Sequence, residues 1–308
     1  MMAVLRLSSS LTLLVAATAL ATACASASGR RSAPPGTAQP DQFLFERGKD
    51  NLERRKWLTS REYFKQVTET YTQSPVRPDA KLGIGDTYLG EGSAEALVLA
   101  IAEFQEFLSF YPTHPRADYA QYKLALAHFK QMRAAQRDQT ETREAVREFQ
   151  TFVARYPNSA LMPEVKNRLR EAKDRLSEAE FEVGRFYWRI RWYPGAIDRL
   201  SALLKDDPEF TARDGAYFYL GESLMQVNRK AEALPLYEKL VAEFEQSEYL
   251  QGAVQRMHEI KTGDETLSTA GTPQLPAAGP AAAKPAPGMP TSAPPNGSGG
   301  SGVTANPR

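Results

Sequence analysis

An internal repeat constrains the fold of this chain more than any other feature of its sequence. Residues 104–112 read FQEFLSFYP, and residues 149–157 read FQTFVARYP. In both segments apolar residues spaced by three and four fall on one helix face, and a proline ends the pattern. Similar patterns begin at Phe64, Tyr193 and Leu234. Because one such unit cannot bury its own apolar face, the repeat predicts a stacked helical array.

Each of these segments is preceded by another helical segment, and the two together match the tetratricopeptide pattern of a first and a second helix. In that pattern a small residue lets two helices approach, and a large residue of the second helix fills the gap. Gly184 is followed at the expected spacing by Ala196 and Leu200. The other copies contain Gly48, Ser60 and Phe64; Gly85, Ala100 and Phe104; Gly221, Ala233 and Tyr237; and, for the second helix of the third copy, Ala145 and Phe149. We therefore predict an all-α fold, an α-solenoid of about five tetratricopeptide-like hairpins over residues 41–261.

Two irregularities interrupt this array. A polar loop is inserted in the third copy near residues 133–142. From Pro163 to Tyr187 the helical pattern then continues without a break. It predicts one long helix that links the third and fourth hairpins and sets the angle between them.

The N-terminal segment has the layout of a secretory signal. In residues 1–23, Arg6 is followed by an apolar run over residues 11–20 and then by small residues. This run is shorter than the roughly 20 residues that span a bilayer. Cys24, the only cysteine, comes next and resembles the lipidated cysteine of a bacterial lipobox. We predict a lipoprotein signal peptide over residues 1–23, lipidation of Cys24, and a flexible tether over residues 24–40. The alternative is an ordinary signal-peptidase cut next to an incidental cysteine.

The C-terminal segment, residues 262–308, is rich in Pro, Gly and Ala and lacks aromatic residues. Such a composition buries too little apolar surface to offset the entropy of ordering, so we predict a disordered tail. The tail is either inert or a spacer that reaches another envelope component.

The sequence contains no pattern of catalytic or metal-binding residues. Lys and Arg number 38 and Asp and Glu 37, so the chain lacks the field that attracts nucleic acid. One cysteine and three scattered histidines do not predict a metal site, and His128 fits a buried core position. The hydrolase and nucleotide-binding motifs are missing from the sequence. We predict no enzyme activity, no cofactor, no metal and no nucleic-acid partner.

The first helices of the hairpins should line a concave groove. Apolar anchors mixed with charges suit an extended peptide or the edge of a partner protein, although any one position could equally be a packed or solvated face. The predicted partner-binding positions, counted from the small residue of each hairpin, are Phe45, Lys49, Leu82, Asp86, Phe181, Arg185, Trp188, Arg189, Phe218, Glu222 and Met225.

The order of these motifs resembles the BamD family, lipoproteins of the machinery that assembles outer-membrane β-barrels. The resemblance covers roughly residues 41–250. It rests on residues 111–119 (YPTHPRADY), residues 155–159 (RYPNS), Arg168 and Leu169 with residues 173–176 (KDRL), and the stretch from Phe181 to Asp207 with Tyr187, Ala196, Ile197, Arg199 and Leu204.

The resemblance implies a scaffold at the outer membrane, anchored by lipid and facing the periplasm. It implies C-terminal hairpins that dock on a BamA-like barrel subunit, N-terminal hairpins that receive unfolded outer-membrane protein precursors, and contacts with other subunits of the machinery. The alternative function is a tetratricopeptide adaptor lipoprotein that coordinates cell-wall synthesis or division.

Overall fold

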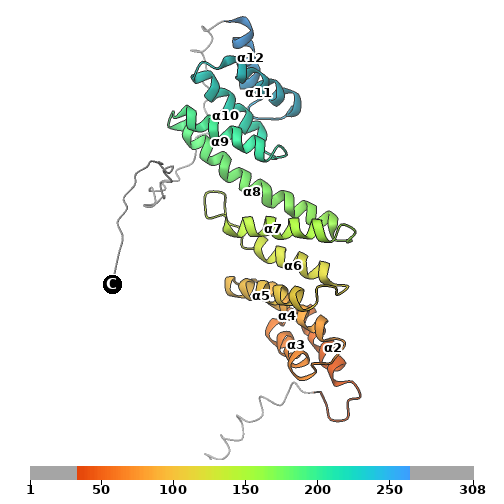
Figure 1. The fold of residues 1–308 in the computed structure, drawn as a ribbon. Helices are drawn as coiled ribbons and strands as arrows, with labels where there is room; N and C mark the ends of the chain where they lie inside the picture. The colour runs from red at the N-terminus through yellow and green to blue at the C-terminus, as the bar shows by residue number, and fades with distance from the viewer. Residues whose placement is uncertain (1–32, 264–308) are drawn as a thin grey trace, which may run out of the picture. The chain divides into compact units, whose positions relative to one another are not determined.

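The computed structural model describes residues 33–263, which form eleven α-helices and no strand (Figure 1). The all-α prediction is confirmed. The signal segment 1–23, Cys24, the first part of the tether and nearly all of the tail lie outside the described residues. The helices are α2 (Pro40–Glu53), α3 (Trp57–Thr70), α4 (Arg77–Glu91), α5 (Ala94–Phe110), α6 (Ala117–Phe129), α7 (Thr140–Arg155), α8 (Met162–Arg189), α9 (Tyr193–Asp206), α10 (Arg213–Gln226), α11 (Lys230–Glu243) and α12 (Leu250–Thr262).

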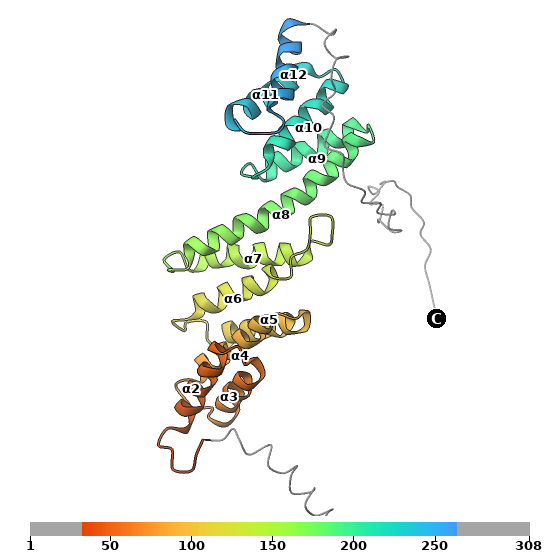
Figure 2. The same ribbon diagram turned by 180° about the vertical axis from the view of Figure 1, so that it is seen from behind.

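The helices pack in sequence order as five hairpins, each a first and a second helix, followed by α12 (Figures 1 and 2). The hairpins are α2–α3, α4–α5, α6–α7, α8–α9 and α10–α11. Each first helix also contacts the first helix of the next hairpin, from α2 to α4 through to α8 and α10. The first helices therefore share one face of the array, as the repeat predicts.

Glycines at the helix crossings set the register of four hairpins. A Cβ atom built on Gly184 would lie 2.5 Å from Leu200, far inside van der Waals contact. The equivalent distances are 2.5 Å from Gly48 to Phe64, 2.6 Å from Gly85 to Phe104, and 2.7 Å from Gly221 to Tyr237. These are the pairs that the tetratricopeptide pattern predicts, so the predicted register is confirmed.

The third hairpin uses alanine at its helix crossing. Ala125 of α6 is fully buried in one cluster with Ala145, Phe149 and Phe152 of α7. The sequence did not reveal this position, because Ala125 stands in a run of small and apolar residues that gives no single candidate. A loop over residues 130–139 separates the two helices and contains most of the predicted insertion.

Three of the turns inside hairpins share one backbone geometry. Arg55, Arg191 and Asn228 have φ values of 56°, 63° and 60°, in the left-handed region. In each turn the next residue closes a hydrogen bond to a carbonyl five residues back, as from Trp192 N–H to Tyr187 (2.9 Å). This is the Schellman pattern that ends helices, which glycine satisfies with least strain.

The long helix α8 joins two of the three hydrophobic clusters. Its first half packs Val165 and Leu169 against α7, and its second half places Phe181 in the cluster of α9, α10, α11 and α12. A separate cluster fills hairpins one and two and reaches into α6. The predicted continuous helix between hairpins three and four is confirmed. Among the described helices, none combines the length and the apolar character needed to cross a membrane.

Candidate protein-interaction surfaces

The predicted groove residues divide into buried and accessible positions. The buried side chains are Leu82, Phe181, Phe218 and Glu222. The accessible ones are the exposed Lys49 and Arg189 and the partly buried Phe45, Arg185, Trp188 and Met225, and the side chain of Asp86 is only 13% exposed. The accessible positions can meet a partner directly, whereas the buried ones support the helices that carry them.

On α2, two of these residues form an open cationic and aromatic surface. The Phe45 ring packs on Phe64, with 5.8 Å between ring centroids. The ammonium of Lys49 lies 5.6 Å from the centroid of the Phe45 ring and 3.1 Å from Glu46. This pair offers an apolar anchor beside a charge that water still reaches.

On α4, Asp86 joins the second hairpin to the third. Its carboxylate accepts a hydrogen bond from the Tyr119 hydroxyl (2.9 Å) and lies 3.5 Å from Lys123 Nζ. Burial raises the pKa of Asp86, although Lys123 and Tyr119 favour the ionised form. Asp86 therefore mainly links α4 to α6 within this chain.

Aromatic rings cluster where α8 meets α10. The Trp188 ring lies 4.9 Å from the Tyr219 ring in an edge-to-face arrangement, and Phe218 stacks on Tyr249 at 5.0 Å. Arg185 pairs with Glu182 at 2.9 Å beside them. Phe218 and Tyr219 are buried, whereas Trp188, Arg185 and Tyr249 remain partly open to a partner.

Glu222 is bound by residues of this chain. It is 6% exposed and accepts hydrogen bonds from the Tyr237 hydroxyl (2.7 Å) and from Arg256 (2.7 and 2.9 Å). These bonds raise the pKa of Arg256 and hold α11 and α12 against α10. The structure thus gives Glu222 a contact inside the array.

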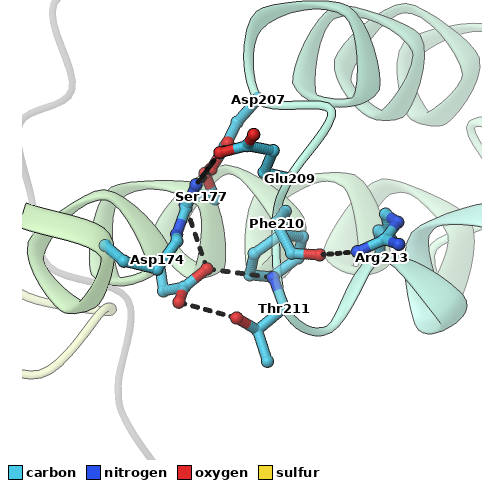
Figure 3. A network of polar contacts seen from close by, with 8 residues as sticks. Asp174, Ser177, Asp207, Glu209, Phe210, Thr211 and Arg213 are labelled. Atoms are coloured by element: carbon cyan, nitrogen blue, oxygen red, sulfur yellow. Dashed lines mark hydrogen bonds and ion pairs between the residues drawn. The ribbon is translucent and has the colours of Figure 1, made fainter. Parts of the chain in front are cut away.

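A polar network on α8 fixes the turn between α9 and α10 (Figure 3). Arg170 donates two hydrogen bonds to Asp207, and the Ser177 hydroxyl donates to the same carboxylate. Asp174 accepts from the backbone N–H (2.9 Å) and the hydroxyl (2.7 Å) of Thr211. Although burial opposes it, hydrogen bonding from Arg170 and Ser177 keeps the pKa of Asp207 below its usual value.

A recurrent serine–aspartate contact was not predicted from the sequence. The Ser74 hydroxyl, in the turn after α3, donates to Asp41 in the first turn of α2 (2.6 Å). The same 2.6 Å contact joins Ser159 to Asp118 and Ser247 to Asp214. Each serine lies three residues after an aromatic residue, as Ser74 follows Tyr71, and this spacing is the signal that could have identified it.

Two cavities open between the hairpins. One, of about 440 Å³ between α7, α8 and α9, is lined by Leu176, Glu180 and Arg199 among others. Another, of about 560 Å³ between α3, α4 and α5, is lined by Lys81, Glu103 and Phe110 among others. Both mix apolar and charged walls, which suits a protein partner.

The described residues hold no group of three or more His, Cys, Asp or Glu placed to bind a metal ion. His128 is buried, with Nδ1 2.8 Å from a Glu141 carboxylate oxygen.

Comparison with known proteins places this chain among bacterial envelope proteins. A family model described as "YfiO: Outer membrane lipoprotein" matches residues 37–234. The outer membrane protein assembly factor BamD of Caulobacter vibrioides is 28% identical over 222 residues, which cover 71% of this chain and 72% of that protein. BamD of Vibrio cholerae is 26% identical, with 56% of this chain and 75% of that protein covered.

Among solved structures, this chain is similar to the TPR2AB domain of yeast Sti1 in its complex with pHSP90. The match covers 72% of this chain and 98% of the Sti1 chain. Its sequence identity is 12% and its TM-score is 0.37.

Proposed function

Because the chain belongs to the YfiO family of outer membrane lipoproteins, we propose that it is a scaffold of the machinery that assembles β-barrel proteins in the outer membrane. The match over residues 37–234, which contain four hairpins and the start of the fifth, carries this proposal. The names of the relatives, outer membrane protein assembly factors, support the same role. The work of the protein is to hold other polypeptides, and catalysis has no part in it.

Cys24 anchors the chain to the inner leaflet of the outer membrane, and residues 25–39 connect this anchor to α2. Two or more acyl chains give the stable attachment that one chain does not. We expect Cys24→Ala to leave the protein soluble or unsorted in the periplasm, away from the outer-membrane fraction, whereas Ser26→Ala leaves it in that fraction. Unchanged outer-membrane fractionation of Cys24→Ala would contradict the lipid anchor.

The C-terminal hairpins dock a BamA-like barrel subunit. The cavity between α7, α8 and α9 supports this docking site, because its apolar wall is flanked by Arg199 and Glu180, which lie 3.5 Å apart and half exposed. We expect an affinity-tagged chain to recover the barrel subunit from detergent-solubilised membranes. Arg199→Glu should reduce this recovery, and Lys166→Glu, on the exposed side of α8, should not. Recovery of cell-wall synthases in place of the barrel subunit would contradict the proposal.

The N-terminal hairpins receive unfolded β-barrel precursors. The open pair of Phe45 and Lys49 on α2 offers an apolar ring and a charge to an extended peptide. A photo-cross-linking residue at position 49 should capture precursors in cells. The same residue at the exposed Gln105, on the second helix α5, should not. Equal capture at both positions would show that the first helices provide no specific surface.

A further inference from the structure

The turns that follow α6 and α8 lie on the same side of the array, at the left in Figure 1 and at the right in Figure 2. Six exposed side chains on these turns and on the last residue of α8 form a surface that we call the basic edge: Arg133, Arg137, Arg189, Ile190, Arg191 and Trp192. Ile190 and Trp192 are 53% and 52% exposed, large fractions for apolar side chains of this size. The basic edge thus combines arginines with exposed apolar groups.

The arginines of the basic edge are available to a ligand. In the part of the chain that the structure describes, none of Arg133, Arg137, Arg189 and Arg191 lies within ion-pair distance of an acidic side chain, although the exposed Asp138 stands in the same turn and interacts with the charge of Arg133. Arg191 also occupies a left-handed position that glycine would fill with less strain. Arg191 therefore places a long cationic side chain in this turn, at a position where the backbone conformation favours glycine, which has no side chain.

The ends of the C-terminal hairpins that lie away from the basic edge are mainly acidic. The end of α9 and the turns after α9 and α11 expose four acidic residues, Asp206, Glu209, Glu245 and Glu248, against one exposed basic residue, Lys205. A large anionic surface would attract the basic edge and repel these turns. The charge distribution therefore favours one orientation of the C-terminal hairpins on such a surface.

We propose that the basic edge binds the anionic phospholipid headgroups of the bilayer beside which the chain is anchored. This inference rests on the membrane location in the proposed function. Tryptophan and isoleucine flanked by arginine form the combination that occupies a lipid–water interface. These side chains lie at or next to protruding turns. A protruding turn can contact a flat bilayer, whereas a peptide ligand normally binds in a groove. A bilayer therefore fits the basic edge better than an acidic protein segment.

Vesicle binding by residues 24–308 carrying Cys24→Ser, the predicted mature chain without its acyl anchor, tests the proposal. We expect it to float with vesicles of phosphatidylcholine containing about one third phosphatidylglycerol, and to bind pure phosphatidylcholine weakly. Salt should weaken the binding. Each arginine near an anionic surface raises affinity about fivefold, so Arg189→Glu with Arg191→Glu should lower binding at least tenfold.

A matched variant controls for net charge. Lys205→Glu with Lys239→Glu makes the same charge change at exposed positions on α9 and α11, and should alter vesicle binding by no more than about twofold. Circular dichroism confirms that both double variants fold. Equal binding by the wild type and the Arg189→Glu, Arg191→Glu variant, or equal loss in both double variants, would overturn the proposal.

Tryptophan fluorescence gives an independent readout. Anionic vesicles should shift the emission of the protein to shorter wavelength, and Trp192→Phe should remove the shift while Trp57 and Trp188 remain. If vesicles are not bound and Arg189→Glu with Arg191→Glu instead abolishes recovery of a protein partner, the basic edge is a protein contact and the proposal is wrong. Recovery of the barrel subunit by the wild-type chain tests the proposed function separately.

Discussion

At the scale of single residues, four of the five hairpins depend on the close approach of a glycine to a large side chain. Gly184→Leu should lower the free energy of unfolding by about 2 kcal/mol or more, because a Cβ there already overlaps Leu200 and the added atoms force the helices apart. Urea denaturation measures this loss as a lower midpoint at constant slope. Lys166→Leu, at an exposed position of the same helix, serves as the control and should change stability little. A Gly184→Leu variant as stable as the wild type would refute the packing described for α8 and α9.

The left-handed residue between α8 and α9 gives a second prediction of opposite sign. Arg191→Gly should raise the free energy of unfolding by about 0.5–1 kcal/mol, because glycine adopts a φ of 63° without the strain of a Cβ atom. Arg175→Gly, in the interior of α8, should lower it by about 1 kcal/mol. Thermal unfolding of the two variants compares them directly. A loss of stability in Arg191→Gly would mean that contacts of the arginine side chain stabilise the fold by more than the left-handed backbone conformation destabilises it.

At the scale of elements, the network of Figure 3 ties α8 to the turn before α10. Asp207→Asn should lower the free energy of unfolding by about 2 kcal/mol at neutral pH, because it removes a charged partner from Arg170 and Ser177. The folded state lowers the pKa of Asp207, so its contribution is complete above the pKa of the unfolded chain, about 4, and is lost as pH falls through the lower folded value. The difference in urea midpoint between the wild type and Asp207→Asn should therefore shrink below about pH 4. A difference that stays constant down to pH 2 would contradict this role.

The elements also show what the sequence could and could not predict. The hairpins and the long helix were predictable, because glycine spacing and apolar periodicity are local signals. Phe218 and Glu222 were expected in a groove, yet every residue of α10 from Gly215 to Leu224 is buried. This helix packs against α8, α9 and α11, so positions that face a groove in an open repeat are covered by neighbours. The serine–aspartate contacts escaped prediction because the partners are far apart in sequence and meet only when the hairpin closes.

At the scale of the whole described array, three hydrophobic clusters follow one another along the chain, so damage to one should remain local. Leu200→Ala should cost about 2–5 kcal/mol in the C-terminal hairpins, because Leu200 is fully buried. Hydrogen exchange should then accelerate in α9, α10 and α11 and stay unchanged in α2, α3 and α4. Phe64→Ala provides the reciprocal control, with faster exchange confined to the first two hairpins and α6. Uniform acceleration along the array would show a single cooperative unit.

The length of α8 couples these clusters mechanically. A helix of 28 residues extends about 42 Å, and its two halves are built into different hairpins. Because α8 is one continuous hydrogen-bonded helix with no loop inside it, a displacement of one half also moves the other half. Any two polypeptides bound to the third and fourth hairpins would therefore be held at an angle that the helix α8 determines.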